Sequence, residues 1–128
     1  SLNVDEKTYP MVGAFPIDVT LHRRPQGHGY IKVEVSQENP FYPIGTVLTG
    51  HEFHYSSVTV EDEDIKLRCC FKVIRGYGFD GKRDGICCYN CLGTYVHLHA
   101  LGAPLWAGRF VNRAADFAAR KRFADGPS

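Results

Sequence analysis

Alternation of apolar and polar residues with a period of two is the feature that most constrains how this chain can fold. In Gly29–Val35 the apolar and the charged side chains fall on opposite sides of an extended backbone: Ile31, Val33 and Val35 against Lys32 and Glu34. This pattern is typical of a strand with one face buried and the other in water. We expect further extended runs within residues 45–60, 65–75 and 86–100.

Two intervening segments have the composition of loops. The acidic residues Glu61–Asp64 predict a solvated turn. Residues 76–85 hold four glycines and two aspartates, which also favours a loop.

Helical periodicity is found only after Pro104, a residue suited to a first helical turn. From there apolar side chains recur at steps of three and four residues, with charged side chains on the other side: Trp106, Phe110, Ala114, Phe117 and Ala118. We expect the helix to end near Phe123, before Asp125-Gly126-Pro127. The predicted class is therefore α/β, strand-rich with a closing C-terminal helix.

Length and charge exclude several classes of function. The chain has 128 residues and a net charge of +1, enough for one small domain or a piece of a larger one. We expect no nucleic acid and no membrane partner, because the net charge is small and no apolar run is long enough to span a bilayer. Five cysteines, an odd number, favour a reducing, cytoplasmic setting over a disulfide framework. The start at Ser1 rather than at methionine suggests a fragment of a longer protein.

Four of the six histidines lie in two groups, His51 with His54 and His97 with His99. The first group lacks the spacing of a zinc protease helix, and on an extended segment its two rings would point to opposite faces. His97 and His99 would share one face of a strand. A metal-binding β-rich module is the alternative function that these residues leave open. Its site would use His97 and His99, with one histidine of the first group or with Cys88 and Cys91 as further ligands.

The cysteines do not resemble catalytic nucleophiles. A nucleophilic cysteine usually lies at a tight turn between a strand and a helix, among small residues whose backbone N–H groups can hold an oxyanion. The five cysteines instead lie in or beside apparent strands: Cys69, Cys70, Cys87, Cys88 and Cys91. We expect small buried core thiols.

One heptapeptide, Gly50–Ser56, reads Gly-His-Glu-Phe-His-Tyr-Ser and closely resembles the signature of cobyrinic acid a,c-diamide synthases in their C-terminal glutamine amidotransferase domain. Three further segments resemble motifs of that family in the same order: Tyr9–Gly13, Gln26–Tyr30 and Tyr95–His99. Together the four motifs are spread over most of the length of the chain, from Tyr9 to His99.

The resemblance implies a fold, a reaction and a site. The fold would be the C-terminal portion of a flavodoxin-like class I glutamine amidotransferase, with residues 1–128 forming a single partial domain. By position His97 matches the family's catalytic histidine. The other motif residues would line the glutamine pocket or support His97: His51, Glu52, His54, Tyr55 and His99.

The resemblance also implies what this chain lacks. The family's nucleophilic cysteine lies in a Cys-Gly-Gly segment upstream, and its N-terminal domain uses ATP and Mg²⁺ to activate a tetrapyrrole carboxylate. We therefore expect a carbon–nitrogen ligase with glutamine as amido donor in the full-length protein, an inactive fragment in isolation, and no metal in this fragment. A homodimer is one assembly compatible with this reading.

The acceptor and the catalytic competence stay open. Pro25–Gly29 and Asn39–Pro43 also resemble relatives that amidate sirohaem-type rings, so the acceptor would be either a corrinoid or a sirohaem or sirohydrochlorin. A structural remnant without catalysis is the remaining alternative.

Overall fold

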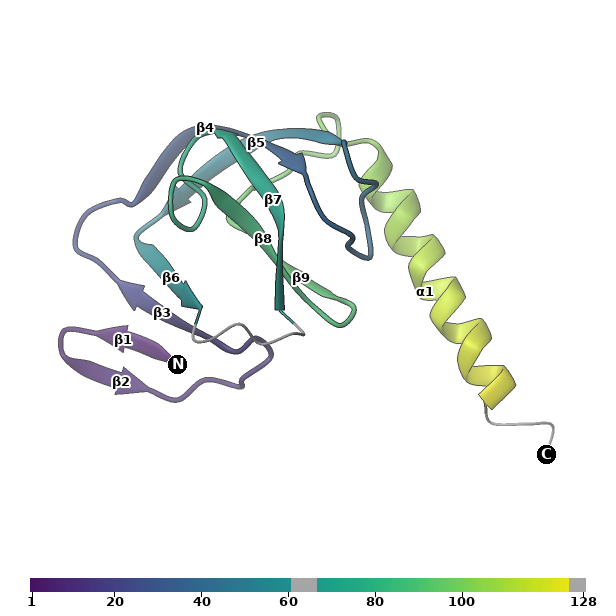
Figure 1. Cartoon of the computed structure of the whole chain (residues 1–128), viewed down its shortest axis with the longest axis horizontal. Coiled ribbons are helices and arrows are strands. Elements are labelled where there is room, and N and C mark those ends of the chain that lie inside the picture. The colour runs from purple at the N-terminus through teal and green to yellow at the C-terminus, as the bar shows by residue number, and fades with distance from the viewer. Residues whose placement is uncertain (61–66, 125–128) are drawn as a thin grey trace.

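The computed structural model describes residues 1–60 and 67–124 of the chain, which form two sheets and one helix (Figure 1). The acidic segment Glu61–Asp64, predicted to be a turn, lies outside the described residues. The elements in chain order are β1 (Leu2–Val4), β2 (Lys7–Tyr9), β3 (Ile17–Leu21), β4 (Gly27–Val35), β5 (Val47–His54), β6 (Ser56–Val60), β7 (Leu67–Arg75), β8 (Arg83–Cys88), β9 (Cys91–Gly93) and α1 (Leu105–Ala124).

The larger sheet has the strand order β5-β4-β7-β8-β9, and all its neighbouring strands are antiparallel. Its strand β4 confirms the predicted alternation, since Ile31, Val33 and Val35 are fully buried while Lys32 is exposed. These side chains pack with Leu48 of β5 and Phe71 of β7 in the main core. The core thus lies on one face of this sheet, and the other face of β4 and β5 is exposed to solvent.

The smaller sheet has the order β2-β1-β3-β6. One extended segment serves both sheets, because β5 ends at His54 and β6 begins at Ser56. Two backbone hydrogen bonds hold this corner: the N–H of His22 donates to the Tyr55 carbonyl at 2.8 Å and that of Gln26 to the His54 carbonyl at 2.9 Å. The extended run predicted within residues 45–60 is thereby confirmed, with the change of sheet at Tyr55.

The strand-rich α/β class with one C-terminal helix is confirmed for the described residues. Among their strands only β1 and β3 pair in parallel. Parallel strands need long crossover connections, usually helices, and this part of the chain connects most neighbours by hairpins. The flavodoxin-like arrangement stays a prediction.

One long strand over residues 86–100 was a wrong prediction. The chain turns back at Tyr89, whose φ of +52° lies in the left-handed region, and β8 and β9 form a hairpin in which Cys88 is opposite Cys91. Beyond Gly93 the extended pairing is reduced to a single bridge between His97 and His51. The alternation of apolar and polar residues in the sequence thus extends past Gly93, where strand β9 ends.

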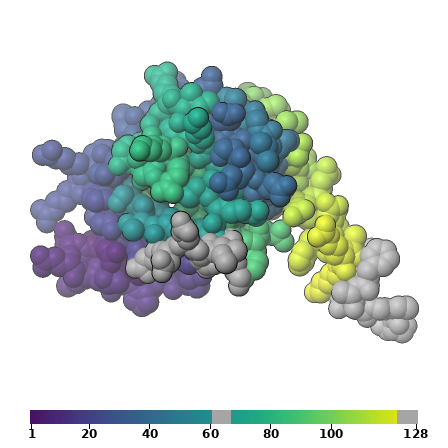
Figure 2. All heavy atoms as spheres, in the orientation of Figure 1, coloured from purple at the N-terminus to yellow at the C-terminus, as the bar shows by residue number. Residues whose placement is uncertain are grey.

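Helix α1 begins one residue after Pro104 and ends one residue past Phe123, as predicted. It does not close over a sheet, because Trp106, Phe110 and Phe117 are 41%, 55% and 63% exposed. Figures 1 and 2 show its C-terminal half standing away from the body of the molecule. Phe110 stacks on Phe41 with ring centroids 5.9 Å apart, and the Arg113 guanidinium donates to Asn90 Oδ1 at 3.1 Å. No helix in the described ranges is both long and apolar enough to cross a membrane.

Candidate functional site

Strand β5 sends the residues of the Gly50–Ser56 motif to opposite faces of the larger sheet. Glu52 and His54 point inward and are 2% and 7% exposed, whereas His51 and Phe53 are exposed. This confirms the expectation that His51 and His54 diverge, which follows from the two-residue repeat of a strand. The motif therefore contributes one buried pair and one exposed pair.

Glu52 is a buried carboxylate whose oxygens accept backbone hydrogen bonds. The N–H of Tyr77 donates to Oε1 at 2.7 Å and that of Gly78 to Oε2 at 2.9 Å. A buried carboxylate persists only when such donors satisfy it. Glu52 thus ties the turn after β7 to β5, which fits a supporting role.

His54 completes this buried pair. Its Nδ1 lies 2.8 Å from the Ser56 carbonyl and its Nε2 lies 3.4 Å from Glu52 Oε2. Its ring stacks on Tyr95 with centroids 3.6 Å apart and an interplanar angle of 8°. A Cβ at position 27 would overlap His54 Nε2 and lie 2.7 Å from Glu52 Oε2. The Gln26–Tyr30 motif therefore needs glycine at Gly27, because the buried pair of the other motif packs against it.

His97 is exposed and is joined to β5 by its backbone. Its N–H donates to the His51 carbonyl at 2.8 Å, and the His51 N–H donates to the His97 carbonyl at 3.1 Å. Residues directly opposite in an antiparallel pair send their side chains to the same face, so the imidazole of His97 shares the face of His51. A Cβ at Gly50 would lie 2.5 Å from the His97 carbonyl oxygen and 2.7 Å from Val96 Cγ1. Glycine at this position lets the His97 segment reach β5.

The exposed side chains of β4 and β5 form an aromatic surface, which we call the outer face: His28, Tyr30, His51 and Phe53, with Tyr55 at the corner. The rings meet edge to face. His51 lies 6.3 Å from His28 and 6.2 Å from Tyr30, and Phe53 lies 5.3 Å from His28 and 5.6 Å from Tyr55. His97 borders this surface through its bridge to His51.

His99 serves the turn that precedes α1. Its Nδ1 accepts the Leu101 N–H at 3.2 Å, and its carbonyl accepts those of Gly102 and Ala103 at 2.9 and 3.0 Å. The prediction that His97 and His99 share the face of one strand is wrong, because only His97 pairs with a strand and the chain turns at His99.

The thiols are core residues on β7 and β8 and a surface residue on β9. Cys70, Cys87 and Cys88 are buried as predicted, whereas Cys69 is half-buried and Cys91 is exposed, and all five are free. Burial raises the pKa of the Cys70 thiol to about 12, which leaves it a poor nucleophile. Among the described residues, no three or more His, Cys, Asp or Glu side chains are placed to hold a metal.

Sequence reasoning missed Asp84, which is fully buried. One carboxylate oxygen accepts the N–H groups of Gly85 and Tyr95, at 2.8 and 3.1 Å; the other accepts the Thr94 hydroxyl and the Val96 N–H, at 2.8 and 3.2 Å. Burial raises the pKa of Asp84, and these hydrogen bonds offset part of the rise. The signal in the sequence was the apolar run that starts two residues later, at Ile86, because a carboxylate leading into a buried strand needs partners.

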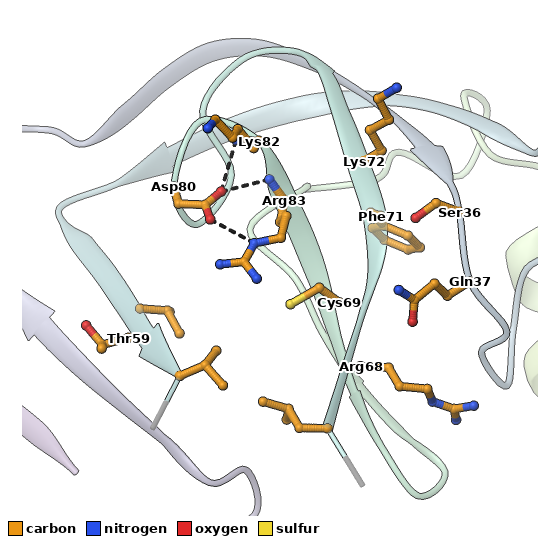
Figure 3. A pocket seen from close by; sticks show the side chains of 13 residues that line it. Ser36, Gln37, Thr59, Arg68, Cys69, Phe71, Lys72, Asp80, Lys82 and Arg83 are labelled. Carbon is orange, nitrogen blue, oxygen red and sulfur yellow. Dashed lines mark hydrogen bonds and ion pairs between the residues drawn. The ribbon is translucent and has the colours of Figure 1, made fainter. Parts of the chain in front are cut away.

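A cleft of about 960 Å³ lies between β6, β7 and the loop before β8 (Figure 3). It holds basic side chains, among them Arg68, Lys72 and Lys82, and an ion pair of 2.9 Å between Arg83 Nε and Asp80 Oδ2. It contains no histidine and none of the residues that the motifs predicted. His97 lies elsewhere, beside the outer face.

Comparisons with known proteins agree with the motifs. Residues 2–105 match the model of the CobB/CobQ-like glutamine amidotransferase domain. Three similar curated proteins are all called cobyrinate a,c-diamide synthase. That of Magnetococcus marinus is 42% identical over 79% of this chain, that of Archaeoglobus fulgidus 38% over 89%, and that of Methanothermobacter thermautotrophicus 34% over 90%.

The chain spans only 21%, 24% and 25% of the lengths of these relatives. No solved structure matches the chain. Since the family match runs from Leu2 to the first residue of α1 and includes β4, β5 and the bridge at His97, the chain belongs to the family of CobB/CobQ-like glutamine amidotransferase domains.

Proposed function

We propose that this chain supplies the catalytic histidine of a glutaminase, and that the ammonia released serves an ATP-dependent amidoligase acting on tetrapyrrole carboxylates. The observation that carries the proposal is the placement of His97. Its imidazole is exposed, while two backbone hydrogen bonds hold its main chain against β5. A general base needs both properties, access to the reacting atoms and a defined position.

In the proposed reaction a cysteine thiol attacks the amide carbon of glutamine. His97, as the neutral imidazole, takes the thiol proton as the carbon–sulfur bond forms. It then gives that proton to the nitrogen as the carbon–nitrogen bond breaks and ammonia leaves. Water hydrolyses the thioester and releases glutamate and the thiol.

The nucleophile in this proposal comes from a segment outside this chain. The five cysteines lie on β7, β8 and β9, whereas His97 borders the outer face of β4 and β5. A base and its nucleophile must come within roughly 3 Å of each other, so the cysteine-bearing segment would meet the molecule beside the outer face. His51 and Tyr55 would then lie near the bound glutamine, Glu52 with His54 would support β5 from behind, and His99 would support the turn that follows His97.

The remaining parts of the proposal concern the whole protein. Residues 1–128 would form the C-terminal part of a flavodoxin-like class I amidotransferase domain. ATP and Mg²⁺ would serve a separate ATP-binding domain. Glutamine is the expected substrate, the free thiols fit a cytoplasmic setting, and a homodimer is one assembly compatible with the proposal.

The names of the relatives favour a corrinoid acceptor over a sirohaem-type ring, since all three are called cobyrinate a,c-diamide synthase. The ATP-binding domain would bind and select the acceptor.

A chimera tests the proposal. Residues 2–105 would replace the matching segment of the Magnetococcus marinus synthase, and amidation of cobyrinate would be measured with glutamine and with ammonia. We expect both nitrogen sources to work, and the isolated chain to release no ammonia from glutamine. A folded chimera that uses ammonia but not glutamine would identify this segment as a remnant without catalysis.

A further inference from the structure

We propose that Asp84 is the positioning residue that places His97 for proton transfer, an inference that rests on the proposed function. Asp84 lies at the start of β8, and its side chain is fully buried. Three of its four hydrogen-bond partners belong to the segment immediately before His97: the Thr94 hydroxyl and the N–H groups of Tyr95 and Val96. One side chain thus fixes the approach of the chain to His97.

The hydrogen bonds from Asp84 replace those that a neighbouring strand would make. Residues 94–96 belong to no strand, so their N–H groups lack the ladder partners that a sheet provides. Unpaired buried N–H groups are costly. The Asp84 carboxylate accepts two of them, and the Thr94 hydroxyl shares the Val96 N–H at 3.0 Å. The carboxylate therefore takes the place of a neighbouring strand along this part of the segment.

The remaining contacts of the segment fix Tyr95. Its hydroxyl lies 2.5 Å from Ser56 Oγ. Its ring stacks on His54 and meets Phe79 edge-on with centroids 5.5 Å apart. These contacts hold a side chain two residues before His97, whereas Asp84 holds the backbone up to the residue directly before it.

The pairing of His97 with His51 is an isolated bridge. Two hydrogen bonds without neighbouring ladder bonds restrain the backbone weakly by themselves, so the position of His97 depends on where Val96 is held. The Asp84 backbone is itself constrained. Gly85 has a φ of +70°, and a Cβ there would lie 2.6 Å from the Phe71 ring.

A displacement of 1 Å in a catalytic group can cost about a hundredfold in rate. Replacing the carboxylate with an amide, as in Asp84→Asn, puts an NH₂ group where one oxygen accepted hydrogen bonds, and the donors on that side lose their acceptor. We expect glutamine-dependent turnover to fall by about ten- to a hundredfold.

Hydrogen exchange in the 128-residue chain tests the positioning directly. In Asp84→Asn the amides of His97 and His51 should lose at least about tenfold in protection, while those of Ile31 and Val33 in β4 keep theirs. The matched control is Asp80→Asn. Asp80 also accepts backbone N–H groups, those of Lys82 and Arg83, but it does not contact residues 94–97. An equal loss of protection at all amides would mean that Asp84 contributes only to overall stability, and it would overturn the proposal.

A second variant keeps the proposal testable if Asp84→Asn fails to fold. Thr94→Val removes one hydroxyl that donates to Asp84 and accepts from Val96, and it should lower protection at His97 selectively and by a smaller factor. Unchanged protection at His97 in this variant would also overturn the proposal.

The chimeric synthase separates this inference from the proposed function. There Asp84→Asn should lower kcat for glutamine by the stated factor, with KM and the ammonia-dependent rate unchanged and Asp80→Asn normal. Circular dichroism and the amide protection of Ile31 and Val33 in β4 show that the substituted domain is folded. Full glutamine activity in Asp84→Asn, together with none in His97→Ala, would refute the positioning role alone. Full activity in His97→Ala would refute the proposed function. The hydrogen-exchange data would still show whether Asp84 positions the backbone at residue 97.

Discussion

Replacing Gly50 by alanine should break the contact between β5 and the His97 segment. The new Cβ would lie 2.5 Å from the His97 carbonyl oxygen, against an ordinary contact of 3.4 Å or more, so the two segments would have to part by about 0.9 Å. The hydrogen bonds between His51 and His97 would then lengthen from 2.8 and 3.1 Å beyond the range of a hydrogen bond.

The expected cost follows from those two hydrogen bonds. Each contributes about 1 kcal/mol, and the smaller backbone entropy of unfolded alanine returns about 0.4–1 kcal/mol. Residual overpacking against Val96 adds to the cost. We therefore expect Gly50→Ala to lower the free energy of unfolding by about 2 kcal/mol.

Urea unfolding followed by circular dichroism gives this free energy, and hydrogen exchange at His51 and His97 gives the local effect. Gly102→Ala is the matched control, since its Cβ would lie 3.5 Å from the His99 carbonyl oxygen, an ordinary contact. It should change stability by less than about 0.5 kcal/mol. If Gly50→Ala were as stable as this control and kept its protection at His97, the steric explanation of the motif glycine would be refuted.

Three further predictions address the buried groups. Gly27→Ala should destabilise the chain by about 2 kcal/mol or more in urea unfolding, because its Cβ overlaps the buried pair Glu52 and His54; a neutral result would contradict that packing. Burial raises the pKa of Asp84 above its ordinary 3.8, so the stability from this group is full below about pH 3.8 and is lost as the pH rises through the folded-state pKa. The free energy of unfolding of the wild type relative to Asp84→Asn should therefore fall as the pH rises above about 4, and a rise would contradict the direction of the shift. A thiol reagent should modify Cys91 first and Cys70 only on unfolding, and the fast phase should vanish in Cys91→Ser.

Local patterns predicted the strand at β4 and the helix α1 because their causes are local. Alternation identified β4, where one face is buried in the core. The same alternation misled over residues 86–100. Tyr89 turns the chain, and Asp84, ten positions before Thr94, accepts the hydrogen bonds of the segment that follows β9.

The surroundings of α1 and the position of His97 depend on contacts between residues far apart in the chain. Periodicity defined the apolar side of α1 but not what covers it, and Phe110 and Phe117 are exposed in this chain. The motifs identified His97 as the candidate base. The face of the sheet on which the His97 side chain lies is set by the bridge to His51, 46 positions earlier in the chain. No local pattern encodes that pairing.

The ratio of glutamine-dependent to ammonia-dependent amidation in the chimeric synthase tests the central claim most directly. His97→Ala should bring this ratio close to zero while the ammonia-dependent rate stays at the level of the unsubstituted chimera. His99→Ala should retain most of the ratio, because that side chain serves the turn before α1. Normal use of glutamine by the His97→Ala enzyme would contradict the assignment of His97 as the catalytic base.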